Sequence, residues 1–247
     1  MKLWSLAVPA ALAIIGIVGA SYLSVPAVAV LSGAAALLAG VCWPHLIGVP
    51  VRRTQGAALG LAGAAAAAGA YFAPAGAMLT WLPAVVAVGV GAVFLIQLLR
   101  GTGQAHRLES IVGIISGVLV VALGSGWVAA DRLAGAEGDP ALLSVAGSAA
   151  LAALAVTLIP LPDRMAAPLG LLVGGLTASL VALVVAGIPW QAAAFSGVVI
   201  AAVVMAFRRL ALSRKDVSNT AGRLALGLAP VLVLGSVVYF LGRLLVP

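Results

Sequence analysis

Long apolar stretches, separated by short polar connections, run along the whole chain of 247 residues. A helix needs about 20 mostly apolar residues to cross a bilayer. Nine stretches meet this requirement, approximately residues 3–22, 27–47, 55–74, 78–99, 110–130, 141–161, 166–187, 190–209 and 223–244. The pattern predicts an all-α fold, a polytopic transmembrane helix bundle of about nine spans that forms a single integral membrane domain over residues 1–247.

The composition points to the same environment. The chain is 64% hydrophobic and 8% charged, whereas a soluble domain is roughly half apolar and about a quarter charged. A net charge of +7 would suggest nucleic acid as the partner of a soluble domain, but here the basic residues lie in the connections between apolar stretches. We therefore expect contact with the lipid bilayer and with anionic lipid headgroups, and no nucleic acid.

The basic residues also predict an orientation. If the connection from Ser21 to Pro26 faces outward, the later connections alternate, and eleven of the 13 Lys and Arg residues fall on the cytoplasmic side. Only Arg132 and Arg243 fall outside. Because basic residues concentrate on the cytoplasmic side, we predict a multi-pass protein with a cytoplasmic N-terminus and an outside C-terminus. The Ala/Gly-rich, Arg-over-Lys composition suits a bacterial-type inner (plasma) membrane.

The first span allows two interpretations. Met1-Lys2 followed by an apolar run and by Val18-Gly19-Ala20 fits a secretory signal with its cleavage site. Against this, the surroundings of Ile15-Gly16-Ile17 loosely resemble those of Gly124 and Gly235, which favours a permanent span. The sequence leaves both interpretations open.

Two short motifs occur twice along the chain. Leu46-Ile47-Gly48-Val49-Pro50-Val51-Arg52 is matched 112 residues later by Leu158-Ile159-Pro160-Leu161-Pro162-Asp163-Arg164, and Leu123-Gly124-Ser125 is matched by Leu234-Gly235-Ser236 at an offset of 111. A unit with an even number of spans returns the chain to its starting side, so its two copies point the same way. We predict a first span in residues 1–26 and then two parallel four-span repeats, residues 27–133 (spans 2–5) and 141–247 (spans 6–9).

Residues that could carry catalysis are scarce. Every Asp, Glu, Lys and Arg falls in a connection or at the end of a span, which argues against a relay of buried carboxylates. His45 and His106 have no partner at metal-ligand spacing, so we expect no metal site and no cofactor. Without a nucleophile and base that could face each other, we expect no catalytic residues and no enzymatic activity.

Two arginines are the first candidates for ligand binding. Arg52 and Arg164 each follow a proline by two residues at matching cytoplasmic turns. Two guanidinium groups on either side of a central axis could hold one phosphate through paired hydrogen bonds, or each could simply contact lipid headgroups. Gln97 and Arg100 are a second pair, because they lie one turn apart and share a helix face at the cytoplasmic boundary.

Ser125 and Ser236 complete the candidate set. They occupy matching positions in the two predicted repeats. In a bilayer, a serine hydroxyl either bonds back to the preceding helical turn or faces a cavity, and back-bonding is the more frequent case.

These features favour a small membrane permease or translocator of a small or lipid-linked substrate, anionic if the arginines bind it, with its site between the repeats. The alternative is a non-catalytic membrane subunit or scaffold of a larger cell-envelope or respiratory complex, associated with other membrane protein subunits. The lack of an ATPase motif and of ionisable residues at depth supports the alternative. A permease should purify alone or as a homo-oligomer, whereas a subunit should bring other chains with it.

Overall fold

The structure is a computed structural model that describes residues 3–48, 52–99, 107–134, 138–185, 188–213 and 219–245. Within these ranges the regular structure is entirely helical. The helices are α1 (Trp4–Ser21), α2 (Val25–Ile47), α3 (Arg52–Phe72), α4 (Leu82–Leu99), α5 (Arg107–Leu123), α6 (Gly126–Asp131), the short 3-10 helix η1 (Arg132–Ala134), α7 (Pro140–Leu158), α8 (Asp163–Val184), α9 (Trp190–Ser213) and α10 (Thr220–Leu245). Each predicted stretch coincides with one helix, except that α5 and α6 share the fifth. The predicted polytopic helix bundle is confirmed.

Eight helical segments of the described chain are long and apolar enough to cross a membrane, with α5 and α6 counted as one segment, Glu109–Asp131. The exception is α3. Its 21 residues would rise about 31 Å at 1.5 Å per residue, but it opens with Arg52-Arg53-Thr54-Gln55 and continues with Ala and Gly, which are only weakly apolar. Because α3 packs along α2, α4 and α5, we treat it as part of the bundle.

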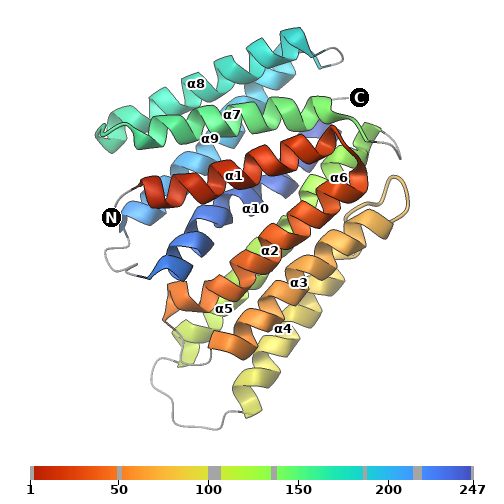
Figure 1. The fold of residues 1–247 in the computed structure, drawn as a ribbon, viewed down its shortest axis with the longest axis vertical. Helices are drawn as coiled ribbons and strands as arrows, with labels where there is room; N and C mark the ends of the chain where they lie inside the picture. The colour runs from red at the N-terminus through yellow and green to blue at the C-terminus, as the bar shows by residue number, and fades with distance from the viewer. Residues whose placement is uncertain are drawn as a thin grey trace.

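The helices fall into two groups that are inclined to one another (Figure 1). Helices α2 to α5 form one group, and α1 lies with α7, α8 and α9 in the other. Helix α10 joins the groups, because it packs against α1 and α9 on one side and against α2, α5 and α6 on the other. The buried core therefore follows α10 through the molecule.

Small residues allow the closest helix contacts within each group. A methyl group added at Gly40 of α2 would overlap the backbone of Gly60 on α3, and one added at Gly197 of α9 would lie 2.6 Å from the β-carbon of Ala178 on α8. Close backbone approach of this kind stabilises helix pairs in lipid, where the hydrophobic effect does not drive helices together. The glycines and alanines of the apolar stretches thus serve helix packing.

The first span is an integral part of this packing. Ile14 and Ile17 of α1 are each 1% exposed, and α1 packs against α2, α7 and α10. The predicted superposition of α2–α6 on α7–α10 remains a prediction. Part of the first repeated motif, residues 49–51, lies outside the described residues.

Candidate functional site

The fifth span is broken where the repeated Leu-Gly-Ser motif lies. Helix α5 ends at Leu123 and α6 begins at Gly126, so Gly124 and Ser125 form a turn between them. A break inside a membrane releases backbone carbonyls that need new donors. The Ser236 hydroxyl of α10 donates to the Leu123 carbonyl at 2.8 Å. The Ser32 hydroxyl of α2 donates to the Gly124 carbonyl at 3.2 Å, which also accepts from the backbone nitrogen of Trp127 at 3.2 Å.

The second copy of the motif packs directly against this break. A methyl group at Gly126 would overlap the backbone of Ser236, and one at Gly235 would lie 2.9 Å from the backbone nitrogen of Trp127. The Trp127 indole also donates to the Val231 carbonyl of α10 at 2.8 Å. Glycine is required on both sides because the backbones of α6 and α10 touch here.

Ser125 and Ser236 therefore meet at a tightly packed helix crossing. They are 1% and 3% exposed. Ser125 bonds back to the Ala122 carbonyl at 2.7 Å, as expected of a serine in a membrane helix. The hydroxyl of Ser236 neither bonds back to its own helix nor faces a cavity, the two cases expected from sequence, because it donates to the Leu123 carbonyl of α5. Both hydroxyls donate to backbone carbonyls in the last turn of α5, so they stabilise the break between α5 and α6.

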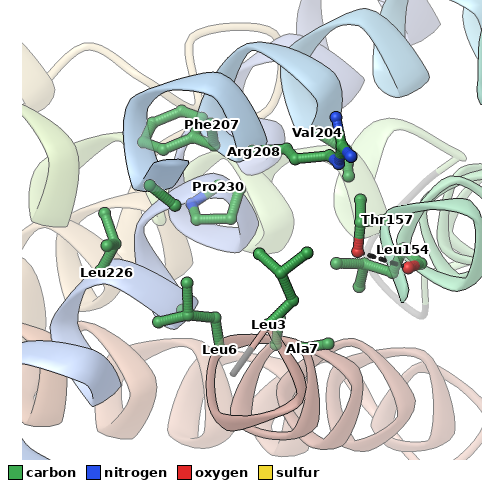
Figure 2. A pocket seen from close by; sticks show the side chains of 13 residues that line it. Leu3, Leu6, Ala7, Leu154, Thr157, Val204, Phe207, Arg208, Leu226 and Pro230 are labelled. Carbon is green, nitrogen blue, oxygen red and sulfur yellow. Dashed lines mark hydrogen bonds between the residues drawn. The ribbon is translucent and has the colours of Figure 1, made fainter. Parts of the chain in front are cut away.

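A cavity opens between α1, α7, α9 and α10, at the end of the bundle where α1 begins (Figure 2). We call it the α1–α10 cavity. Its walls are mostly aliphatic, and its volume is about 40 Å³. Its lining residues are Leu3, Leu6, Ala7, Ala10, Leu154, Thr157, Val204, Phe207, Arg208, Ala211, Leu226, Gly227 and Pro230.

Arg208 brings a positive charge to this apolar cavity. From sequence it was assigned to the cytoplasmic connection after the eighth span, but it lies inside α9 and is only 8% exposed. Its Nη2 donates to the Leu161 carbonyl just after α7 at 3.1 Å. In Figure 2 its guanidinium lies on the same side of the cavity as Thr157, whose hydroxyl donates to the Leu154 carbonyl at 2.6 Å. Sequence position alone did not reveal that this arginine faces the interior.

Two helices that line the cavity each contain a proline. Pro230 interrupts α10 and lines the cavity, while Pro9 interrupts α1. A proline has no N–H, so the carbonyl four residues earlier loses its usual helical donor. For Pro230 this carbonyl belongs to Leu226, another lining residue. The cavity therefore combines an apolar wall with the guanidinium of Arg208 and the hydroxyl of Thr157.

The structure does not bring together the helices that carry Arg52 and Arg164. Arg52 opens α3, which packs against α2, α4, α5 and α6, and its side chain lies outside the described part of the molecule. Arg164 is exposed near the start of α8, which packs against α7 and α9. A phosphate held by both would have to bridge the two helix groups. Their joint binding role remains a prediction.

Gln97 lies inside the α2–α5 group. It is 3% exposed, so its side chain packs between helices, and its predicted partner Arg100 lies outside the described residues. The predicted shared face of Gln97 and Arg100 at the cytoplasmic boundary remains a prediction. Sequence reasoning missed Gln55 of α3, which is fully buried and has no hydrogen-bond partner for either amide atom. Helical spacing places Gln55 on one face with Leu59 and Ala62, but only the packing shows that this face is buried.

The way α3 packs against α4 places Gln55 and Gln97 at the same height along the two helix axes. A methyl group at Gly69 would lie 3.1 Å from the β-carbon of Trp81, and one at Gly89 would lie 3.4 Å from that of Ala62. Because the helices are antiparallel, two further turns along each lead to Gln55 and Gln97. The α2–α5 group thus has two buried amides at the end where α3 begins.

Asp131, like Arg208, is a charged residue that lies close to a connection along the sequence and is nevertheless buried. Along the sequence it borders the connection that contains Arg132 and is predicted to face outward, but it is the last residue of α6 and is fully buried. Neither of its carboxylate oxygens has a hydrogen-bond partner. It lies at the opposite end of the bundle from Arg208, which is the end predicted to face outward.

No family, no curated protein and no solved structure matches the chain. A function must therefore be argued from the buried groups and the α1–α10 cavity themselves.

Proposed function

We propose that the chain is a small membrane permease or translocator of an anionic, lipid-linked substrate, with the α1–α10 cavity as its binding site. One observation carries the proposal: the buried guanidinium of Arg208 lies at the edge of a cavity with aliphatic walls. A hydrocarbon chain suits such walls, and a guanidinium suits a phosphate or carboxylate. A lipid-linked anion presents both chemistries in one molecule.

The cavity is small enough to require movement during transport. A volume of about 40 Å³ accepts the tip of a hydrocarbon chain or a few headgroup atoms, but no complete lipid. Helix α1 forms one wall, and its Leu6 carbonyl would lie 2.6 Å from a methyl group at Gly227 of α10. We propose that α1, interrupted by Pro9, moves away from α10 to admit the substrate.

The test compares two neighbouring arginines. Arg208→Gln removes the buried charge, whereas Arg209→Gln removes an exposed charge and is the matched control. The chain is purified in mild detergent, and retained anionic lipid is measured by native mass spectrometry. We expect retention to fall at least about tenfold in Arg208→Gln, because a hydrogen bond to a charged group contributes about 1.5–3 kcal/mol, and to be unchanged in Arg209→Gln.

Transport is measured separately in vesicles that contain fluorescent phosphatidylglycerol or fluorescent phosphatidylcholine. A quencher added outside reports movement of the probe from the inner leaflet. We expect the wild-type chain to accelerate movement of the anionic probe and Arg208→Gln to abolish the acceleration. Equal retention and equal transport in the two glutamine variants would contradict the proposal.

The alternative, a non-transporting subunit of a membrane complex, also has an observation in its favour. A groove of about 480 Å³ runs between α3 and α4 on the outside of the bundle, lined by Ala58, Leu61, Ala62, Ala65, Ala84, Val85, Val88, Gly89 and Ala92. Such a small-residue surface suits a helix from another chain. Purification in mild detergent followed by mass spectrometry distinguishes the two functions, because only a subunit would bring other chains with it in fixed ratio.

A further inference from the structure

Asp131 lies in a closed environment at the outer end of the bundle. All six residues of α6 are buried, and a methyl group at Gly138 would lie 3.0 Å from the Asp131 Oδ2 and 2.9 Å from the Val25 Cγ2 of α2. The backbone nitrogen of Asp139 donates to the Asp131 carbonyl at 3.2 Å. Gly138, which has a φ of +81°, therefore packs closely over the carboxyl group.

An ionised carboxylate would be costly in this position. Burying a charge without a partner or hydrogen-bond donors costs several kcal/mol, and the usual response of a carboxyl group is to take up a proton. The neutral acid avoids most of this cost because it carries no net charge. The geometry alone thus favours the protonated form.

The charged and titratable side chains at this end have partners elsewhere. On η1, Arg132 donates to the Ala70 carbonyl of α3 at 2.6 Å. On α10, Arg243 donates to the Gly76 carbonyl and to the Tyr239 hydroxyl, each at 3.1 Å.

The remaining groups supply no cation either. Tyr22, which follows α1, shares a hydrogen bond of 2.8 Å with Ser144 of α7, and the Asp139 carboxylate accepts from the Ala141 nitrogen at 2.8 Å. Tyr71 near the end of α3 is partly buried. The first turn of α2 has no acidic residue, and Glu137 lies outside the described residues. Asp131 therefore has a second carboxylate nearby and no described basic side chain bonded to it.

A proton fits this site better than a metal ion. The described residues include no group of three or more His, Cys, Asp or Glu side chains that could hold a metal. We propose that Asp131 is a proton-binding residue whose carboxyl group stays neutral while α6 is packed between α2 and α10. When Asp131 loses its proton to water at the outer face, the carboxylate that remains is unstable in its closed position, so α6 and Gly138 shift to admit water.

This inference does not depend on the proposed transport, and its test measures proton binding directly. Infrared spectra of the full chain in lipid vesicles are recorded over a pH series. We expect the C=O stretching band of a protonated carboxylic acid to persist at about pH 7, where an exposed Asp is ionised. The band should be absent in Asp131→Asn and present in Asp139→Asn, which removes the neighbouring carboxylate and keeps a side chain that can cap α7.

Stability provides a second measurement. If the folded chain holds a proton that the unfolded chain releases, stability present at low pH is lost as the pH rises. The melting temperature of wild type should therefore fall from about pH 5 to about pH 9 relative to that of Asp131→Asn. The absence of a protonated-acid band in wild type at about pH 7 would overturn the proposal. Loss of the band on adding sodium chloride, but not choline chloride, would also overturn it in favour of a cation site.

Discussion

The hydroxyl of Ser236 on α10 lies 2.8 Å from the carbonyl oxygen of Leu123, the last residue of α5, and donates a hydrogen bond to it. Ser236 is the counterpart of Ser125 in the predicted repeat, so the two copies of the Leu-Gly-Ser motif meet at one crossing. Equivalent segments that pack on each other are expected near a two-fold axis. The crossing therefore gives a precise place at which to look for the predicted symmetry.

Replacement of Ser236 by Ala should destabilise the protein more than replacement of Ser125 by Ala. The first change leaves the Leu123 carbonyl without its donor at a break in a membrane helix, at a cost of about 1–3 kcal/mol. The second removes only a local bond from Ser125 to the Ala122 carbonyl in the last turn of α5. The measurement is the melting temperature of each purified variant in the same detergent, and equal shifts would contradict the proposed role of Ser236.

Gly126→Ala should also destabilise the protein, because the added methyl group would overlap the backbone of Ser236. Overpacking typically costs about 1–3 kcal/mol, and a clash with backbone falls at the upper end or beyond. Gly91→Ala of α4 is the matched control, since an added methyl group there meets nothing within 4 Å. Comparable melting temperatures for the two alanine variants would argue against close α6–α10 packing.

Gln55→Leu should stabilise the protein. Both amide atoms of Gln55 are buried without a partner, and an unsatisfied buried polar group costs about 1–3 kcal/mol. Leucine has a similar size and no polar atoms, so a higher melting temperature is expected. A lower one would show that Gln55 has a polar partner in the membrane, such as a bound ligand.

The positions of the helices could be predicted from sequence because span length and apolar composition are local properties. Each predicted stretch is helical, and the break at Gly124-Ser125 lies in a motif that the sequence comparison had singled out. Even α3, whose hydropathy is weak, coincides with a predicted stretch, residues 55–74.

The buried polar groups could not be predicted in the same way, because burial depends on which face of a helix meets its neighbours. Asp131 and Arg208 lie close to connections along the sequence, yet both are inside the packed bundle. The α1–α10 cavity joins residues from four helices that are distant in the chain. Without knowledge of the packing of α10, no pattern along the sequence brings Leu3, Thr157 and Arg208 together.

Orientation in the membrane can be tested by cysteine labelling after replacement of Cys42. Ala75, an exposed residue after α3, lies at the end predicted to face outward, and Ser213, an exposed residue at the end of α9, lies at the other end. We expect a membrane-impermeant maleimide to label Ala75→Cys in intact cells and to label Ser213→Cys only after the membrane is opened. The reverse pattern would overturn the orientation predicted from the basic residues. Gly138 is unsuitable for labelling, because its positive φ and its contacts leave no room for a side chain.

The last prediction concerns Arg52 and Arg164, which open helices in different groups of the bundle. If the two guanidinium groups hold one phosphate, they act as a unit, and Arg52→Lys, Arg164→Lys and the double variant should each lose about tenfold in retained anionic lipid. Lysine keeps the charge that sets orientation but lacks the planar fork that binds two oxygens at once, so the substitution separates binding from topology. Separate headgroup contacts would instead give a double variant with the summed effect of the two single variants. Native mass spectrometry of the four proteins, at matched expression, decides between these outcomes, and full retention in both single variants would show that the arginines serve only as anchors.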